Sequence, residues 1–189
     1  QLAYSDHDQV ADFGQRNYHI NHDSFYGNLL FNSIFGNTLN TFKTGITAAY
    51  DKFDEWVDSN TYSRIDRSAG LFFEYTYNDI DTWSLVLGGR VDKHNRLGTF
   101  FTPRVNVRYT PWQGSALRFS AGQGRKASNI FAENQSLFFT GRTISIDSNQ
   151  GQFYGLGPER ATNYGLSYLQ SFNLFNNQGD FTIDFYRTD

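Results

Sequence analysis

The residues from Phe101 to Thr110 alternate between apolar and polar side chains with a period of two. One face of an extended strand here would carry Phe101, Pro103, Val105, Val107 and Tyr109, and the other would carry Thr102, Arg104, Asn106 and Arg108. Successive side chains of a β-strand point to opposite faces of its sheet. Because the same alternation returns along most of the chain, the sequence favours an all-β fold in which each strand turns one face to an apolar environment.

Two all-β architectures alternate in this way. A soluble β-sandwich packs its apolar face against a second sheet, whereas a transmembrane β-barrel turns that face to lipid and keeps a wet interior that tolerates charge. Arginine recurs at alternate positions in three successive expected strands, and short turns alternate with long polar segments. We therefore predict an all-β, antiparallel up-and-down transmembrane β-barrel, present as a partial wall of about nine strands.

The expected strands lie near residues 2–7, 24–34, 41–50, 68–77, 82–93, 101–110, 116–124, 161–172 and 180–187. Turn-like connections rich in Gly, Asn, Asp and Pro lie near residues 35–38, 78–81, 111–114 and 173–179. Long polar loops are expected at about 51–67 and 125–160, on the opposite rim. Residues 1–189 would then form part of a single barrel domain.

The alternation also predicts which side chains meet lipid. The lipid-facing set is Trp83, Leu85, Leu87, Val105, Val107 and Phe119, and the lumen-facing set is Glu74, Arg90, Asp92, Arg104, Arg108 and Arg118. A charge on the lipid face costs about 2 to 4 kcal/mol at the bilayer midplane, so the arginines are expected on the concave side. Same-face pairing across a five-residue turn around Trp112 would place Arg108 opposite Arg118, and we expect an anion to offset these like charges.

Composition excludes several other classes of protein. No apolar run approaches the roughly 20 residues that a membrane-spanning helix needs, and a formal net charge of -3 gives no sign of a nucleic-acid surface. The chain has no Cys, which excludes disulfides, iron-sulfur clusters and thiol catalysis. It also has no Met and begins at Gln1, so we expect it to be an excerpt of a longer protein.

Catalysis finds little support in the sequence. The histidines are scattered as His7, His19, His22 and His94, and no acidic cluster accompanies them. No combination of nucleophile, base and orienting group can be assembled. We therefore expect no metal site, no cofactor and no enzymatic activity.

Several motifs resemble the barrel domain of TonB-dependent outer-membrane receptors. They are Pro103-Arg104, Tyr109-Thr110-Pro111, Leu117 to Gly122, Gly124 to Glu133 and, after the second long loop, Gly157 to Leu166. Ser128 departs from this pattern, because relatives often carry Pro there. The family's plug and energy-coupling box have no counterpart in the chain, and the resemblance implies that they lie upstream.

The resemblance implies an active importer in the outer membrane of a Gram-negative cell, which takes up an iron chelate, a vitamin or a glycan. Its partners would be the TonB energy-coupling complex acting through the plug, the lipid bilayer, a small-molecule or oligosaccharide ligand and a surface lipoprotein. A passive porin, an outer-membrane adhesin and a soluble all-β binding protein remain as alternatives.

The candidate ligand contacts lie in the second long loop and at the strand end before it. They are Arg125, Lys126, Asn129, Glu133, Gln135, Arg142 and Tyr154, which combine charge, amide groups and an aromatic ring. Such groups suit a chelate or a sugar. The resemblance also bears on Arg108 and Arg118, the two like charges expected opposite each other. The anion that offsets them would be Glu74 or a carboxylate of the plug.

Overall fold

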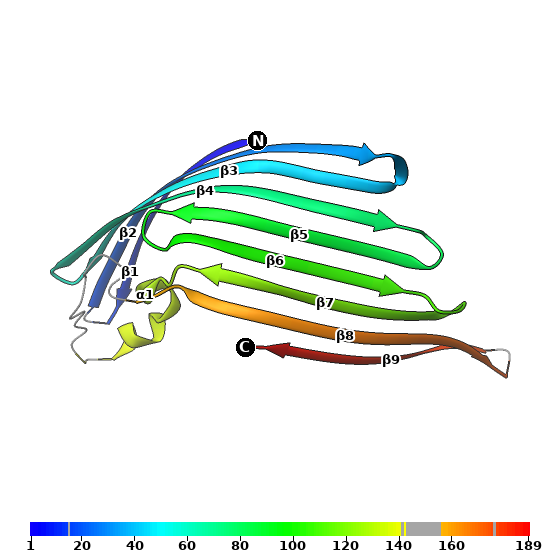
Figure 1. The fold of residues 1–189 in the computed structure, drawn as a ribbon. Coiled ribbons are helices and arrows are strands. Elements are labelled where there is room, and N and C mark those ends of the chain that lie inside the picture. Colours follow the sequence, from blue (N-terminus) through cyan, green and yellow to red (C-terminus); the bar gives the residue numbers. More distant parts are fainter. Residues whose placement is uncertain (15, 141, 143–155, 176) are drawn as a thin grey trace.

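Nine antiparallel strands form one curved sheet in which the spatial order follows the sequence, from β1 to β9 (Figure 1). The computed structural model of the chain describes residues 1–14, 16–140, 142, 156–175 and 177–189. The strands are β1 (Leu2–Phe13), β2 (Arg16–Phe35), β3 (Asn37–Val57), β4 (Asn60–Asn78), β5 (Trp83–His94), β6 (Gly98–Tyr109), β7 (Ser115–Lys126), β8 (Glu159–Leu174) and β9 (Asn177–Thr188). In the described residues β1 and β9 each pair with one strand, so the sheet is an open barrel wall, as predicted.

Two short helices, α1 (Ile130–Glu133) and η1 (Gln135–Phe139), lie between β7 and β8. No helix in the described ranges has the length and apolar character to cross a membrane. At the ends of the long loop expected at 125–160, β7 continues to Lys126 and β8 begins at Glu159. Much of the range between them lies outside the described residues, so the loop remains a prediction.

The prediction of a loop at 51–67 is wrong. β3 and β4 remain paired through this range, from Asp51 opposite Asp66 to Val57 opposite Asn60. A tight turn at residues 58–59 joins them, and Asp58 adopts a positive φ of 53°, which Asp tolerates better than most residues. The Asp58 backbone amide donates to the Asn17 carbonyl oxygen at 2.9 Å, which ties the turn to β2. The long strands β2, β3 and β4 therefore project as one stiff sheet.

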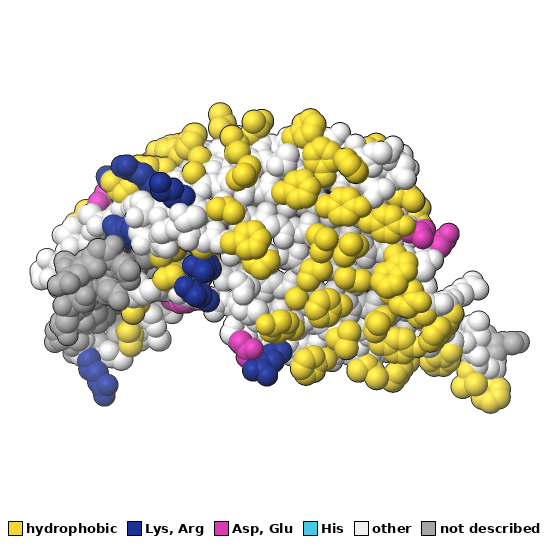
Figure 2. All heavy atoms as spheres, viewed as in Figure 1, with side chains coloured by type: hydrophobic (Ala, Val, Ile, Leu, Met, Phe, Trp, Pro, Cys, Tyr) yellow, Lys and Arg dark blue, Asp and Glu magenta, His cyan; other side chains and the backbone are white. Residues whose placement is uncertain are grey.

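The two faces of the sheet differ in polarity. The register aligns Leu85, Val107 and Phe119 on one face, and it aligns Ser84, Arg108 and Arg118 on the other. On the first face Leu71 is 58% exposed, Leu87 44% and Phe119 41%. Figure 2 shows hydrophobic side chains gathered over most of the face toward the viewer, with Lys and Arg side chains mostly near its loop end. This face has the composition that a lipid-facing surface requires.

The residues predicted to face lipid all lie on one face of the sheet, and the residues predicted to face the lumen all lie on the other. The loop between β7 and β8 crosses the polar face and packs on β2 and β3, through contacts of Phe131 and Phe138 with Tyr18 and Val57. A loop that leaves β7 and contacts the distant strands β2 and β3 of a curved sheet takes the short path across its hollow side, so the polar face is the concave one. That the outer set meets lipid and the inner set meets a lumen remains a prediction.

Aromatic rings fill the places where glycine interrupts the strands. A side chain at Gly45 would meet the Phe72 ring of β4 at 2.7 Å, and one at Gly89 would meet the Phe101 ring of β6 at 2.9 Å. Near the short turns Trp83 stacks on Tyr109 with 4.2 Å between ring centroids. These contacts stiffen the wall between the short turns and the long-strand rim.

Candidate ligand-facing site

The loop between β7 and β8 forms a roof over the concave face at the end where β2, β3 and β4 project. Phe131 of α1 and Phe138 of η1 are each 2% exposed, and they pack on Tyr18, Ile20 and Val57. The ring centroids of Tyr18 and Phe138 lie 5.3 Å apart. Burial of two large aromatic side chains anchors the roof to strands that are remote from it in sequence.

A capping arrangement sets the course of the chain into the roof. The Asn129 side chain accepts a hydrogen bond from the Ala132 backbone amide at 3.2 Å, and Glu133 accepts one from the Asn129 amide at 3.3 Å. Asn at an N-cap satisfies an amide that a helix would otherwise leave unpaired. Glu133 also forms an ion pair with Lys126 at the end of β7. The Lys126 ammonium and the Asn129 amide hold the pKa of Glu133 below its usual value.

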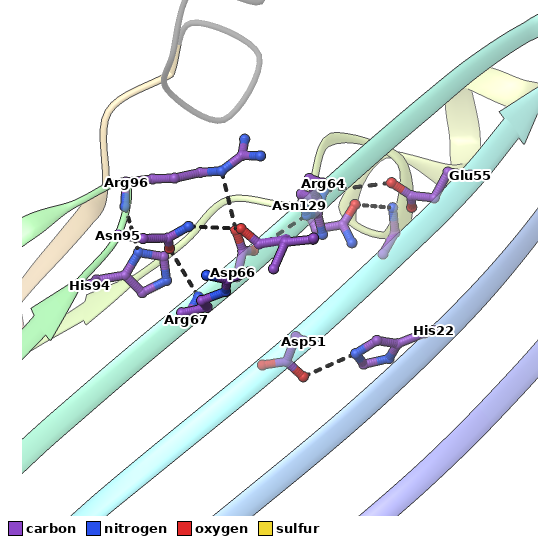
Figure 3. Close-up of polar contacts among 12 residues, drawn as sticks. His22, Asp51, Glu55, Arg64, Asp66, Arg67, His94, Asn95, Arg96 and Asn129 are labelled. Atoms are coloured by element: carbon purple, nitrogen blue, oxygen red, sulfur yellow. Dashed lines mark hydrogen bonds and ion pairs between the residues drawn. The ribbon is translucent and has the colours of Figure 1, made fainter.

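We call the projecting parts of β2, β3 and β4, together with α1 and η1, the rim. A row of side chains with charges of alternating sign lies along the concave side of the rim, beginning beneath the roof (Figure 3). Glu55, 0% exposed, accepts a hydrogen bond from the Tyr18 hydroxyl at 3.0 Å and pairs with Arg64 at 3.5 Å. Arg64 Nε lies 3.4 Å from Asp66, and Arg96 Nε lies 3.5 Å from the same carboxylate. Loss of one charged side chain from this row would leave its partner as a buried charge without a counter-charge, which is strongly destabilising. The row therefore favours a single arrangement of the rim.

The turn between β5 and β6 closes the row at the rim. The Nδ1 atom of His94 accepts from the backbone amides of Arg96 and Leu97 at 3.2 and 3.4 Å. The Asn95 side chain accepts a hydrogen bond from the Arg67 backbone amide and donates one to the Ile65 carbonyl oxygen. These two bonds hold the turn against β4. His94 and Asp66 lie beyond the apolar band, whose last outer side chain on β5 is Val91. Burial lowers the pKa of His94 and raises the pKa of Asp66.

Below the rim the concave face carries further ion pairs and a shallow groove. Arg90 donates to Asp92 and to the Thr47 hydroxyl, and Lys43 lies 3.8 Å from Glu74. A groove of about 560 Å³ runs across β2 to β8 between these side chains. Its floor includes Gly88 and Gly122, which leave room for a partner to approach the backbone.

The structure brings together only part of the predicted ligand-binding set. Lys126, Asn129 and Glu133 lie together, and their mutual contacts shape the roof. Arg125 lies apart, with its guanidinium 5.1 Å from the Phe100 ring centroid. The exposed Arg142 offers its carbonyl oxygen to Arg16 at 2.5 Å. Tyr154 and the side chain of Gln135 lie outside the described residues. Ligand contact by any of these residues remains a prediction.

Sequence reasoning missed the residues that define the rim. Its polar row consists of Tyr18, Glu55, Arg64, Asp66 and Arg96. Three of these residues, Glu55, Arg64 and Asp66, fall in the range predicted as a loop. A signal was present, because Phe53 and Val57 share one strand parity, although it is opposite to the parity of Tyr50 and of the apolar residues before it. High charge in this range masked the pattern.

Within the described ranges no group of three or more His, Asp or Glu side chains is arranged to hold a metal ion. His22 pairs with Asp51 at 3.0 Å and stacks on Phe53, and Asp51 stands opposite Asp66 of the charged row in the register of β3 and β4 (Figure 3).

Comparison with solved structures shows the same fold in two receptors and one transporter. The alcaligin outer membrane receptor FauA from Bordetella pertussis matches with a TM-score of 0.65 and 14% identity, over 100% of this chain and 33% of that one. The ferric enterobactin receptor PfeA from Pseudomonas aeruginosa, as a mutant, matches with a TM-score of 0.62 and 16% identity, over 92% and 27%. The copper transporter OprC matches with a TM-score of 0.57 and 14% identity, over 90% and 30%.

The chain thus spans a third or less of the length of each of these structures. No curated protein matches the chain. A family model described as TonB dependent receptor-like, beta-barrel, matches residues 2–189. With the open antiparallel wall and its inward-folded loop, this match shows that the chain belongs to the TonB-dependent receptor β-barrel family.

Proposed function

We propose that the protein is an active importer of a scarce nutrient in the outer membrane of a Gram-negative cell, energised through TonB. Residues 1–189 supply part of the barrel wall and the outer rim that first meets the ligand. The observation that carries this proposal is the inward fold of the β7–β8 loop, whose Phe131 and Phe138 pack on the concave face of β2 and β3. A loop in this position narrows the mouth of a barrel and presents side chains to its entrance.

An iron chelate is the substrate class that we favour. Two of the structural neighbours described above are named as receptors for alcaligin and ferric enterobactin. The loop above the concave face supports this choice, because it combines the exposed cation Arg142 with polar and aromatic groups. Guanidinium groups bind anionic oxygen ligands through charge-assisted hydrogen bonds. A copper complex, a vitamin and a glycan are the other classes to be tested.

Uptake measurements test the proposal. Cells that produce the full-length receptor, cells that lack it and receptor-producing cells without TonB would each receive radioactive ferric chelates of the catecholate and hydroxamate classes. We expect accumulation only where both the receptor and TonB are present. Uptake that persists without TonB would indicate a passive porin, and equal accumulation with and without the receptor, for these chelates and for copper, a vitamin and a glycan, would reject an import function.

A further inference from the structure

The apolar band on the outer face of the sheet ends along an oblique line. The apolar run ends at Tyr50 on β3, at Ala69 on β4 and at Val91 on β5. The register places Tyr50 opposite Arg67 and Ala69 opposite Lys93, so the edge of the band shifts by two residues from each strand to the next. Strands of transmembrane barrels are tilted by about 35 to 45°, and an edge at one depth in the bilayer then crosses successive strands at shifted positions.

A cation follows the edge of the band on each of these strands. Lys52 on β3, Arg67 on β4 and Lys93 on β5 are the boundary cations, and Figure 2 shows Lys and Arg side chains near this end of the hydrophobic face. Lys52 pairs with Asp54 at 2.7 Å. Arg67 and Lys93 are exposed, and in the described part of the chain neither forms an ion pair with a carboxylate. Two cations without a counter-charge therefore lie where the headgroups of a bilayer would begin.

Arg67 and Lys93 are close enough to contact one anion together. Because Ala69 lies opposite Lys93, Arg67 and Lys93 are diagonal neighbours on adjacent strands, which are about 7 to 8 Å apart. The Arg67 guanidinium lies 5.5 Å from the centroid of the Tyr50 ring, and this contact keeps it on the outer face. Both side chains are long and cationic, so one phosphate can accept hydrogen bonds from both.

A groove of about 840 Å³ lies beside these cations on the same face. Its floor is a row of small residues, Gly27, Ala48 and Ala69, which stand opposite one another on β2, β3 and β4, and the row ends at Lys93. Ala48 is separated from the edge of the band by Tyr50, whereas Ala69 lies at the edge and Lys93 beyond it. The groove therefore descends from Lys93 into the apolar band. Its walls include Leu2, Phe25, Leu29, Ile46, Leu71 and Val91.

We propose that this groove binds an acyl chain of an anionic membrane lipid, whose phosphate headgroup lies between Arg67 and Lys93. A cationic end and a descending apolar floor are complementary to the two parts of such a lipid. A free phosphate would leave the groove unused, and an irregular protein segment at this depth would have unsatisfied backbone groups in lipid. Asp6 and Asp23 stand opposite each other on the outer face of β1 and β2, which confines an anion to the β4 and β5 side.

The inference rests on the membrane location that the proposed function includes, and it goes beyond import because it assigns a ligand to the outside of the wall. Native mass spectrometry of the purified full-length receptor in detergent tests it. Phosphatidylglycerol and phosphatidylcholine with identical acyl chains are the probes, because only the first has a net negative headgroup. Phosphatidylglycerol should bind the tightest site of the wild-type receptor about tenfold more strongly.

The variant R67Q/K93Q should abolish this preference, and R67K/K93R, which keeps both charges, should retain it. The matched control K52Q removes a boundary cation that already pairs with Asp54, and it should leave the preference unchanged. Wild-type receptor in about 1 M ammonium acetate should lose the preference without any substitution, since salt screens exposed charges. An unchanged preference in R67Q/K93Q would overturn the proposal. If that variant does not fold, an unchanged preference of the wild type at high salt would do so.

A substitution on the floor tests the groove separately. Ala48→Phe places a ring where the acyl chain would lie, so it should weaken binding of both lipids at this site. Val107→Phe adds the same ring to the outer face away from the groove, and it should have little effect. Full binding of phosphatidylglycerol to Ala48→Phe, or its displacement by excess inorganic phosphate, would contradict the proposal, because the cations would then bind an anion without using the groove.

These readings are separable from the uptake assay. Lipid binding is measured without any transported substrate, so a receptor that imports none of the chelates can still show the lipid site. Conversely, uptake that depends on TonB in a receptor without the headgroup preference would keep the proposed function and remove the lipid site.

Discussion

The barrel wall and the projecting rim place their hydrophobic side chains on opposite faces of the same sheet. In the wall, from β5 to β9, the apolar side chains point outward, and Leu87 and Phe119 remain 44% and 41% exposed. In the rim, formed by the projecting parts of β2, β3 and β4 with α1 and η1, the apolar side chains point inward. Phe131 and Phe138 are 2% exposed there. Strand parity is continuous, but the face that is apolar reverses.

The reversal shows where the surroundings of the sheet change. On the outer face of β3, the apolar run is broken after Tyr50 by Lys52 and Asp54, and only Trp56 follows before the turn. A wall in lipid needs no protein layer over its apolar face. Strands that project into water must bury their apolar side chains against protein, and here the β7–β8 loop provides the cover. The rim therefore has the side-chain arrangement expected of a part exposed to water, and the wall has the arrangement expected of a lipid-facing sheet.

The largest expected effect comes from removing the anchor of the roof. Phe138→Ala should weaken docking of the loop by about 3 to 5 kcal/mol, because a fully buried aromatic ring leaves a cavity. Hydrogen exchange of residues 130–140 in the full receptor measures this change. Leu137→Ala is the matched control, since Leu137 is 47% exposed, and it should have little effect. Equal effects of the two substitutions would mean that the rim has no core of its own.

The wall is tested by a charge placed on each face in turn. Leu85→Arg on the outer face should destabilise the receptor in lipid bilayers by about 2 to 4 kcal/mol. Val86→Arg, one residue along on the concave face, should cost much less, because its charge stays in water. Unfolding by denaturant in lipid vesicles gives both values. A larger loss for Val86→Arg would reverse the assignment of the faces.

The buried row of charges in the rim should respond to loss of a single carboxylate. Glu55→Gln keeps the shape of the side chain but removes the counter-charge of Arg64, and we expect a loss of about 1 to 3 kcal/mol in rim stability. The control Asp54→Asn changes a partly exposed carboxylate on the outer face, paired with Lys52. Hydrogen-exchange rates of the β3 and β4 amides near the turn at residues 58–59 measure the effect of each variant. Matching rates in the two variants would show that the row contributes nothing.

The smallest effect is a pH dependence at the turn between β5 and β6. Burial lowers the pKa of His94 from its ordinary 6.5, and its Nδ1 atom must stay unprotonated to accept two amides. The unfolded turn therefore binds a proton more tightly than the folded one. Its stability is complete above about pH 6.5 and falls as the pH drops through the lowered pKa. Exchange of the Arg96 and Leu97 amides should accelerate on acidification, beyond the intrinsic effect of pH, and His94→Gln should abolish that response.

The fold of the wall follows closely from local pattern. Expected strands at 82–93 and 101–110 correspond to β5 (Trp83–His94) and β6 (Gly98–Tyr109), because alternation there marks two distinct surroundings. The register of Arg108 with Arg118 also follows from the length of the turn around Trp112. The hairpin at 51–67 does not follow from local pattern, because charged residues such as Lys52, Asp54 and Arg67 interrupt its outer face, and charge resembles loop composition.

The rim could not be predicted from local pattern. Contacts such as Tyr18 with Phe138 and Arg16 with Arg142 join residues more than a hundred positions apart. Nothing in residues 126–140 specifies which strands they cover. Capping by Asn129 and the pairing of Lys126 with Glu133 are local and were within reach, although they shape the loop instead of exposing ligand contacts.

Cysteine labelling along β5 and β6 tests the two-faced wall most directly. The chain contains no Cys, so single substitutions at Leu85, Val86, Asn106 and Val107 each add one thiol to it. In the full receptor in lipid vesicles, we expect a fluorophore at positions 85 and 107 to be quenched by lipid-borne quenchers, and one at positions 86 and 106 to be quenched by a water-soluble quencher. Quenching that does not alternate between neighbouring residues, or that alternates in the opposite sense, would contradict the assignment of a lipid face and a lumen face.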